Sequence, residues 1–326
     1  SLMIYQVIDS RNFGGIESHI LQLACLLHRY NYPVTIVFMR HYSPAHPLRQ
    51  QAESAKIPVL TTAQLPNFYH LKQGDILHGH GYKASLFVRI YGLFSRAKVI
   101  TTFHAGEIAT GKVAFYEWLN RSSAFLSKNI VISQVIGQKI SAKYDYWHNF
   151  ISLPKLPSKL AKPNKIMNVA FVGRLEKVKG FDRFCVMANA LPQYQFHVFG
   201  DGSLHKLIPE HIHDHGMVSA MDGYWSQLDV LLIPSRAEGL PMAAIEAMAN
   251  QVIVIATNVG DLAKLLAPEF LVPNSNWQQL SILLNSLNKL SPSEWKKICD
   301  DNYYKIQRDY SEQQAIKQLK LTYGFC

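Results

Sequence analysis

Two glutamates stand close together in the stretch SRAEGLPMAAIEAMANQ at 235–251, which joins a Gly/Pro turn to an alanine-rich run. Glu238 lies in the turn, and Glu246 lies eight positions later in the run. Two acids near one ligand suit acid–base chemistry such as glycoside hydrolysis. The structural alternatives are a carboxylate that favours the helix dipole at Glu238 and a solvated surface acid at Glu246.

The elements around these acids predict a ligand site at the edge of a sheet. DVLLIPS at 229–235 is an apolar run bounded by turn residues, which is typical of a buried parallel strand. Pro241 suits the first position of a helix, and Asn250 suits its end. Glu238 then follows the strand, and Glu246 lies about 8 Å along the helix. Open α/β sheets bind ligands at this edge, and the free N–H groups of the first helical turn favour a phosphate.

Length and composition favour a globular protein of two domains. A chain of 326 residues exceeds one ordinary hydrophobic core, and 48% of its residues are hydrophobic while 17% are charged. Its four cysteines show no paired or metal-binding spacing, which suits a reducing compartment. The chain has no apolar run of about 18 residues, and it begins with a strand pattern instead of a signal peptide. We therefore expect a soluble cytoplasmic protein.

The positive charge is concentrated in the first half of the chain. Residues 1–160 contain 17 Lys/Arg and 7 Asp/Glu, whereas residues 161–326 contain 16 of each, so the first half carries the whole net charge of +10. This asymmetry predicts a polyanionic partner, such as an anionic membrane, an acidic glycolipid or a nucleic acid. The alternative is a solvated basic face. The stretch YKASLFVRIYGLFSRAK at 82–98 mixes basic and apolar residues, as membrane docking requires, although its apolar face equally suits a core helix.

Strand and helix patterns alternate in both halves of the chain, which predicts an α/β fold with two doubly wound, Rossmann-like domains. Strands are expected at 3–9, 33–39, 75–80, 97–104, 129–134, 168–173, 195–200, 229–235 and 251–257. Helices are expected within 14–30, 83–95, 111–126, 181–190, 241–250, 260–266 and 312–322. The stretch 153–165 holds three prolines and four lysines, which is typical of a linker between domains.

Five motifs occur in an order that resembles the retaining glycosyltransferases of family 4. They are FGGIES (13–18), TTFH (101–104), FVGRLEKVKGFD (171–182), FGDG (199–202) and AEGLPMAAIEAMA (237–249). The resemblance runs from residue 3 to about residue 321 and implies the GT-B fold, in which two domains face each other across a cleft. It implies an acceptor domain at 1–155, a nucleotide-sugar domain at 156–305, and a C-terminal helix in 306–326 that packs back on the first domain.

The resemblance also assigns roles to single residues. Arg174 and Lys179 match the basic pair that grips the donor diphosphate, and Gly15 matches the glycine-rich loop that approaches a donor phosphate. Glu246 matches the acid that accepts hydrogen bonds from the ribose hydroxyls. Glu238 matches the acid beside the transferred sugar, where it favours positive charge at the anomeric carbon.

The remaining expected contacts are His104, which matches the histidine on the acceptor-domain wall, and Met217, which resembles the position that packs on the nucleobase. The start of the helix after Glu238 adds donor contacts at Gly239, Leu240 and Met242.

Histidines and acids give no motif for a metal. His78 and His80 have a one-residue spacing, but we expect loop structure there because no motif supplies a third ligand. The chain lacks an Asp-x-Asp motif, so we expect no metal and no cofactor at the donor site. One departure from the family stands near the first motif, where Ser18 and His19 replace the usual Arg or Lys.

Together these features predict an enzyme that moves a sugar from a nucleotide donor to a hydroxyl of a glycan or lipid-linked acceptor, with retention, in cell-envelope polysaccharide or lipopolysaccharide biosynthesis. The EGLP loop at 238–241 lacks the aromatic-glycine form common in mannosyl members of the family that the chain resembles, so the resemblance implies a UDP-sugar in preference to a GDP-sugar. An epimerase or hydrolase of nucleotide sugars with the same fold is an alternative. A non-catalytic basic binding module is another, although no nucleic-acid-binding motif accompanies the charge, so we expect no nucleic acid as partner.

Overall fold

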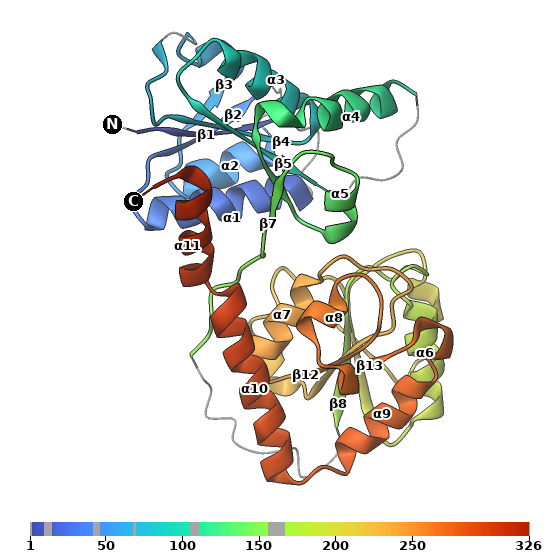
Figure 1. Ribbon diagram of the computed structural model, residues 1–326. Helices are drawn as coiled ribbons and strands as arrows, with labels where there is room; N and C mark the ends of the chain where they lie inside the picture. Colours follow the sequence, from blue (N-terminus) through green and yellow to red (C-terminus); the bar gives the residue numbers. More distant parts are fainter. Residues whose placement is uncertain are drawn as a thin grey trace. The chain divides into compact units, whose positions relative to one another are not determined.

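The computed structural model describes residues 2–9, 15–41, 46–67, 70–104, 111–155 and 167–325 (Figure 1). The chain divides into two compact units, which are treated separately below. Unit 1 comprises Ser1–Asn149 and Glu312–Cys326, and unit 2 comprises Phe150–Ser311. The chain therefore passes between the units at 149/150 and 311/312, whereas the sequence placed the domain boundaries at 155/156 and 305/306. Most of the expected linker, from residue 156 onward, lies outside the described residues.

Unit 1 contains a seven-stranded parallel sheet in the order β3-β2-β1-β4-β5-β6-β7. The strands are β1 Ile4–Ile8, β2 Val34–Phe38, β3 Val59–Thr61, β4 Ile76–His80, β5 Lys98–Phe103, β6 Lys128–Val131 and β7 Tyr144–Tyr146. The apolar central strands are buried on both faces, as parallel strands between helical layers are. The strand order reverses between β1 and β4, which makes their carboxyl ends the topological switch point of this sheet.

Helices cover both faces of the sheet in unit 1. Figure 1 shows α1 (Gly15–Arg29) and α2 (Pro47–Ser54) on one side of the sheet, and α3 (Tyr82–Leu93) and α4 (Lys112–Ser122) on the other. A short helix, α5, spans Gln134–Gln138. The last helix, α11 (Glu312–Tyr323), contacts α1 and completes unit 1.

Unit 2 contains a six-stranded parallel sheet in the order β10-β9-β8-β11-β12-β13, with its switch point between β8 and β11. The strands are β8 Asn168–Val172, β9 Gln195–Phe199, β10 His213–Asp214, β11 Val230–Ile233, β12 Ile253–Thr257 and β13 Leu271–Val272. The helices are α6 Phe181–Ala190, α7 Met242–Ala249, α8 Leu262–Leu265, α9 Gln279–Asn288 and α10 Pro292–Tyr310. Figure 1 shows α7 and α10 on one side of the sheet and α6 and α9 on the other.

The strands and helices expected from sequence are present, with three corrections at their ends. The strand expected at 129–134 ends at Val131, and Gln134 begins α5. Helix α7 begins at Met242, and Pro241 is its N-cap in an extended conformation instead of its first residue. Residues 306–310 form the end of α10 in unit 2, and the extended backbone of Ser311 separates them from α11. Among the described residues, no helix is both long and apolar enough to cross a membrane.

Candidate functional site

The loop after β8 lies directly against the end of β11, at the switch point of unit 2. Gly180 has φ +72°, and a Cβ at this position would lie 1.9 Å from the carbonyl oxygen of Pro234. Only glycine fits here, since a side chain would meet backbone that cannot yield. The backbone N–H of Arg236 donates to the carbonyl of Val178 at 2.8 Å. Two predicted ligand-binding loops are thereby held side by side.

These loops bring Lys179 and Glu238 together. The Lys179 Nζ lies 2.8 Å from one carboxylate oxygen of Glu238, and the Ser235 hydroxyl donates to the other at 2.7 Å. The Glu238 side chain is only 5% exposed, whereas that of Lys179 is 26% exposed. Both carboxylate oxygens are thus fixed by partners, and the ammonium stays accessible from solvent.

A third loop, after β12, supports the backbone on which Glu238 lies. Gly260 has φ +58°, and a Cβ there would lie 2.0 Å from the carbonyl oxygen of Glu238. The N–H of Asp261 donates to the carbonyl of Gly239 at 3.0 Å. The turn that carries Glu238 is therefore held from two sides, which is how a rigid scaffold positions a reactive side chain.

The other predicted donor contacts differ in how far they are buried. Arg174 and Gly239 are exposed, and Leu240 and Met242 are half-buried. Met217, in the loop after β10, has 76% of its surface exposed. Among the described residues, no side chain caps the start of α7, so its first N–H groups keep the positive end of the helix dipole open to a ligand.

Glu246 lies in the fifth position of α7 and is half-buried. Burial raises the pKa of its carboxyl group, and the nearby Asp222 carboxylate raises it further. This environment differs from that of a solvated surface acid, the structural alternative that the sequence left open.

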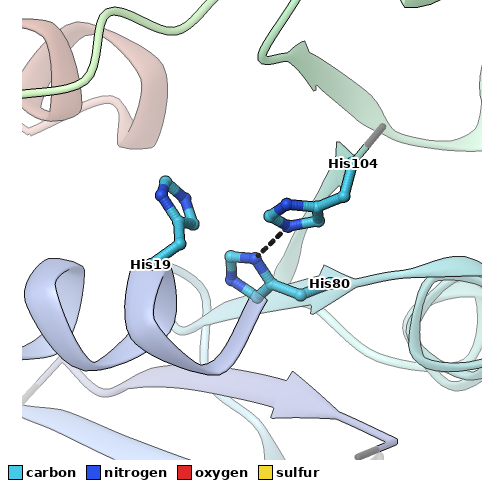
Figure 2. Close-up of side chains that lie close together, drawn as sticks. All are labelled: His19, His80 and His104. Carbon is cyan, nitrogen blue, oxygen red and sulfur yellow. Dashed lines mark hydrogen bonds between the residues drawn. The ribbon is translucent and has the colours of Figure 1, made fainter. Parts of the chain in front are cut away.

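Unit 1 brings three histidines together at its own switch point (Figure 2). His80 ends β4, His104 directly follows β5, and His19 lies on α1. One ring nitrogen from each lies within 4.8 Å of the other two, and His80 Nδ1 lies 3.3 Å from His104 Nε2. Gly15, the first residue of α1, is exposed, and a Cβ there would meet no atom within 4 Å.

A chain of buried hydrogen bonds supports this cluster from within the sheet. His80 Nε2 lies 2.6 Å from the amide oxygen of Gln6, whose amide nitrogen donates to the Tyr323 hydroxyl at 2.8 Å. The same hydroxyl lies 2.7 Å from His78 Nδ1, and His78 Nε2 lies 2.6 Å from the Thr102 hydroxyl. Helix α11 therefore closes a polar network that β1, β4 and β5 begin.

The environment of His19, His78, His80 and His104 favours their neutral form. Burial lowers the pKa of His19 to about 4 and, with the nearby His19 ring, lowers that of His78 to about 3. Burial and the neighbouring imidazoles also hold the pKa values of His80 and His104 well below the usual range. A cluster of this kind presents lone pairs and N–H groups instead of positive charge.

The strand expected at 75–80 is confirmed, so the loop structure expected for His78 and His80 is wrong. His78 does not join the group, and the partners of His80 are His19 and His104, which share no sequence motif with it. In the sequence, each histidine lies at or after the carboxyl end of a strand: His80 ends β4, His104 follows β5, and His19 lies on the helix after β1. Their meeting depends on the order β1-β4-β5, which no local pattern specifies.

Comparison with known proteins places both units in one family. Residues 13–153 match the family model described as Glycosyltransferase Family 4, and residues 167–288 match the one described as Glycosyl transferases group 1. An uncharacterized 41.2 kDa protein in the cps region of Klebsiella pneumoniae is 31% identical over 162 residues, which cover 47% of this chain and 44% of that protein. The O-antigen biosynthesis glycosyltransferase WbnH of Escherichia coli is 31% identical over 121 residues, 35% of each chain.

The aligned regions thus span less than half the length of these curated relatives. Among solved structures, Anabaena HepE in complex with UDP matches with a TM-score of 0.80 at 16% identity, over 100% of both chains. Because the two family models together take in most of the chain and the fold matches over its whole length, the chain belongs to the family 4 (group 1) glycosyltransferases and has the GT-B fold.

Proposed function

We propose that this protein transfers a sugar, with retention at the anomeric carbon, from a UDP-sugar to a hydroxyl of a glycan or lipid-linked acceptor. The observation that carries the proposal is the fixed turn of unit 2, where Lys179 and Glu238 meet at a switch point beside the open start of α7. The family membership supports transfer, and the UDP bound by HepE supports the base. The name of WbnH supports a role in cell-envelope polysaccharide synthesis.

In the proposed reaction, the bond from the anomeric carbon to the diphosphate oxygen breaks while the acceptor oxygen bonds to the same face of that carbon. The acceptor proton passes to the departing phosphate oxygen, so no protein base is consumed. Arg174, Lys179 and the first N–H groups of α7 neutralise the charge that grows on the diphosphate. The proposal therefore needs no metal ion at the donor.

Glu238 then favours positive charge at the anomeric carbon and holds a sugar hydroxyl, and it is not a covalent nucleophile. Because its ion pair with Lys179 already exists, a diphosphate would share the Lys179 ammonium with Glu238. Glu246 accepts hydrogen bonds from the ribose hydroxyls, and Met217 packs on the base. Gly15 approaches a donor phosphate, and His104 hydrogen-bonds the transferred sugar or the acceptor hydroxyl.

We also propose that unit 1 docks on an anionic membrane surface that holds a lipid-linked acceptor. Large apolar side chains are exposed on and beside α3 and α4, namely Ile90, Leu93, Phe94, Val113, Phe115, Tyr116, Trp118 and Phe125. Phe115 stacks on Trp118 and contacts Tyr116 edge-on, so the exposed aromatics of α4 are contiguous. A contiguous apolar patch on a unit whose residues 1–149 contain 15 Lys/Arg and 7 Asp/Glu suits binding to an anionic bilayer.

The basic contribution of 82–98 is smaller than the sequence predicted. Arg89 is buried, and its guanidinium donates to Asn120, Ser123 and Thr101. Its role is structural, because it joins α3 to α4 and β5.

Vesicle sedimentation tests the membrane proposal. The protein should sediment with anionic but not neutral vesicles, and salt raised from about 0.05 to 0.5 M should release it, since screening shortens the Debye length well below about 10 Å. Phe115→Ala with Trp118→Ala should weaken binding, whereas Ile282→Ala, which removes an equally exposed side chain of unit 2, should not. Equal binding to neutral vesicles would contradict the proposal.

Thermal-shift screening of UDP, GDP and their sugars tests the donor. A ligand that binds only the folded state raises the melting temperature according to its affinity. The proposed preference for uridine therefore predicts a larger rise with a UDP-sugar than with its GDP counterpart. With the donor found, UDP release should require an acceptor hydroxyl. Release without an acceptor would instead favour the hydrolase, and isomerised donor would favour the epimerase.

A further inference from the structure

The imidazoles of His19, His80 and His104 converge in the way that a metal ion requires (Figure 2). In a tetrahedral zinc site with Zn–N bonds of about 2.0–2.1 Å, the ligand nitrogens lie about 3.3 Å apart. His80 Nδ1 and His104 Nε2 already lie 3.3 Å apart. The His19 nitrogen completes a group whose atoms all lie within 4.8 Å, so a small side-chain movement closes the set.

The surrounding hydrogen bonds prepare His80 to be a ligand. The Gln6 amide oxygen can only accept, so the proton of His80 is on Nε2 and the lone pair is on Nδ1, which faces His104. Gln6 is itself oriented by its amide donation to Tyr323. Histidine ligands of metals characteristically donate their second N–H to such an oxygen, which fixes the tautomer and the ring.

We propose that His19, His80 and His104 bind one Zn²⁺ ion, with the fourth position open to water or an exchangeable ligand. Zinc is favoured because the group consists of imidazoles alone, which prefer borderline divalent ions over Mg²⁺ or Ca²⁺. His80 is buried, whereas His19 and His104 are half-buried, so the ion has a rigid inner ligand and an accessible outer side. The site lies wholly within unit 1. Bound Zn²⁺ would occupy the ring nitrogen of His104 that the proposed transfer uses, so Zn²⁺ binding is measured without donor or acceptor.

A single hydrogen bond between His80 and His104 is the competing explanation for their distance. It does not account for His19, whose ring centroid lies 5.3 Å from that of His104 and 5.8 Å from that of His80, edge-on to both. It also predicts no metal affinity. The two explanations therefore differ in what the purified protein binds.

Zinc titration of the full chain, after chelation and dialysis, decides between them. Calorimetry should give one Zn²⁺ per chain, and Co²⁺ in its place should develop the visible absorption of a tetrahedral site. His19→Gln should lower the Zn²⁺ affinity at least about a hundredfold, since even the loss of an outer-shell partner costs about 10–100-fold. His28→Gln, an exposed histidine of the same helix, is the matched control and should bind as the wild type does.

A second pair of histidines provides the sharpest negative test. In unit 2, His197 Nδ1 lies 3.0 Å from His215 Nε2, and His213 stacks on His197. Among the described residues, these rings do not bring three ligand atoms close enough together for one ion. His215→Gln should therefore leave Zn²⁺ binding unchanged. Loss of binding in His215→Gln but not in His19→Gln would overturn the proposal, as would wild-type affinity in His19→Gln or no binding by the wild type.

Melting temperatures show whether the variants are folded. Zn²⁺ should raise the melting temperature of the wild type and of His28→Gln but not that of His19→Gln, whose value without metal should match the wild type. If His19→Gln does not fold, His19→Asn takes its place with the same expected result.

Discussion

The switch points of the two sheets have the same topology and opposite chemistry. In unit 2 the loops carry fixed charge, with Lys179 paired to Glu238 and Arg174 exposed nearby. In unit 1 the strands end in imidazoles that burial keeps neutral. Both the Lys179–Glu238 pair and the imidazoles lie at the carboxyl ends of parallel strands. The difference in charge between the two sites therefore comes from their side chains and not from the topology of the sheets.

Because one site is charged and the other is neutral, the two units suit different ligands. A cationic edge with an open helix start suits a diphosphate, whose charge must be met as it leaves. A neutral imidazole cluster suits hydroxyl groups or a borderline metal ion, and it offers no field for an anion. The support differs as well, because glycines fix the loops of unit 2 while buried hydrogen bonds fix the strand ends of unit 1.

The largest effect is expected from Glu238→Ala. Loss of a carboxylate that acts mainly as charge develops should lower kcat about a hundredfold or more, with a smaller loss of donor affinity from the sugar hydroxyl that it holds. The freed Lys179 is 26% exposed and can be solvated, so the variant should fold. Steady-state kinetics measures this loss of kcat. The control variant is Glu269→Ala, which removes an exposed acid of the same unit and should keep the wild-type kcat. Wild-type kinetics in Glu238→Ala would remove it from the site.

The basic residues of unit 2 come next. Arg174→Ala should cost about 2 kcal/mol in transition-state stabilisation, or about thirtyfold in kcat/KM, because part of the diphosphate charge loses its partner. Lys177→Ala changes an exposed lysine of the same loop and should have no effect. Retained activity in Arg174→Ala would show that the diphosphate binds elsewhere.

Lys179 needs a double-mutant cycle, because its removal also leaves Glu238 without its ion-pair partner. Lys179→Met and Glu238→Gln should therefore be strongly non-additive when they are combined. Additive losses in kcat/KM would mean that the two side chains act independently during transfer.

Most of this architecture could be predicted because central parallel strands are apolar runs. Strands β3, β7, β10 and β13 were missed, since two or three residues give no periodicity. Helix α10 was missed although Ser291 and Glu294 form a capping box and Pro292 follows the N-cap, a signal that local sequence does contain. The acids and basic residues of unit 2 follow their strands directly, so motif order located them.

The cluster of unit 1 could not be predicted in the same way. Its members come from α1, β4 and the end of β5, and the supporting Tyr323 comes from α11, more than two hundred residues away in sequence from His80. The strand order and the packing of α11 against unit 1 belong to the tertiary structure, so local sequence patterns do not specify them. Only the alternation along β4, which puts His78 and His80 on one face, was available locally.

Tyr323→Phe tests the support of unit 1. Removing the hydroxyl leaves two buried partners, His78 Nδ1 and the Gln6 amide, without a hydrogen bond, which should cost about 1–3 kcal/mol of folding stability. Tyr304→Phe removes a hydroxyl from a side chain that is 55% exposed and should change stability little. Chemical denaturation of both variants gives the comparison, and equal stabilities would mean that the network contributes nothing net.

The smallest effect is expected from Glu246→Gln, which keeps the shape of the side chain and removes its charge. If Glu246 accepts hydrogen bonds from the ribose, the weaker acceptor in Glu246→Gln should raise the donor Kd about tenfold with kcat nearly unchanged.

The stability of Glu246→Gln should also depend on pH differently from that of the wild type. Burial, with Asp222, raises the pKa of Glu246 in the folded state, so its contribution to stability is present below the unfolded pKa and is lost as pH rises through the folded one. The melting temperature of Glu246→Gln should therefore match the wild type at low pH, exceed it as pH rises between the unfolded and the folded pKa, and exceed it by a constant amount above that. A constant difference across this range would show that the carboxyl group is solvated, and the ribose contact would then have to be sought elsewhere in unit 2.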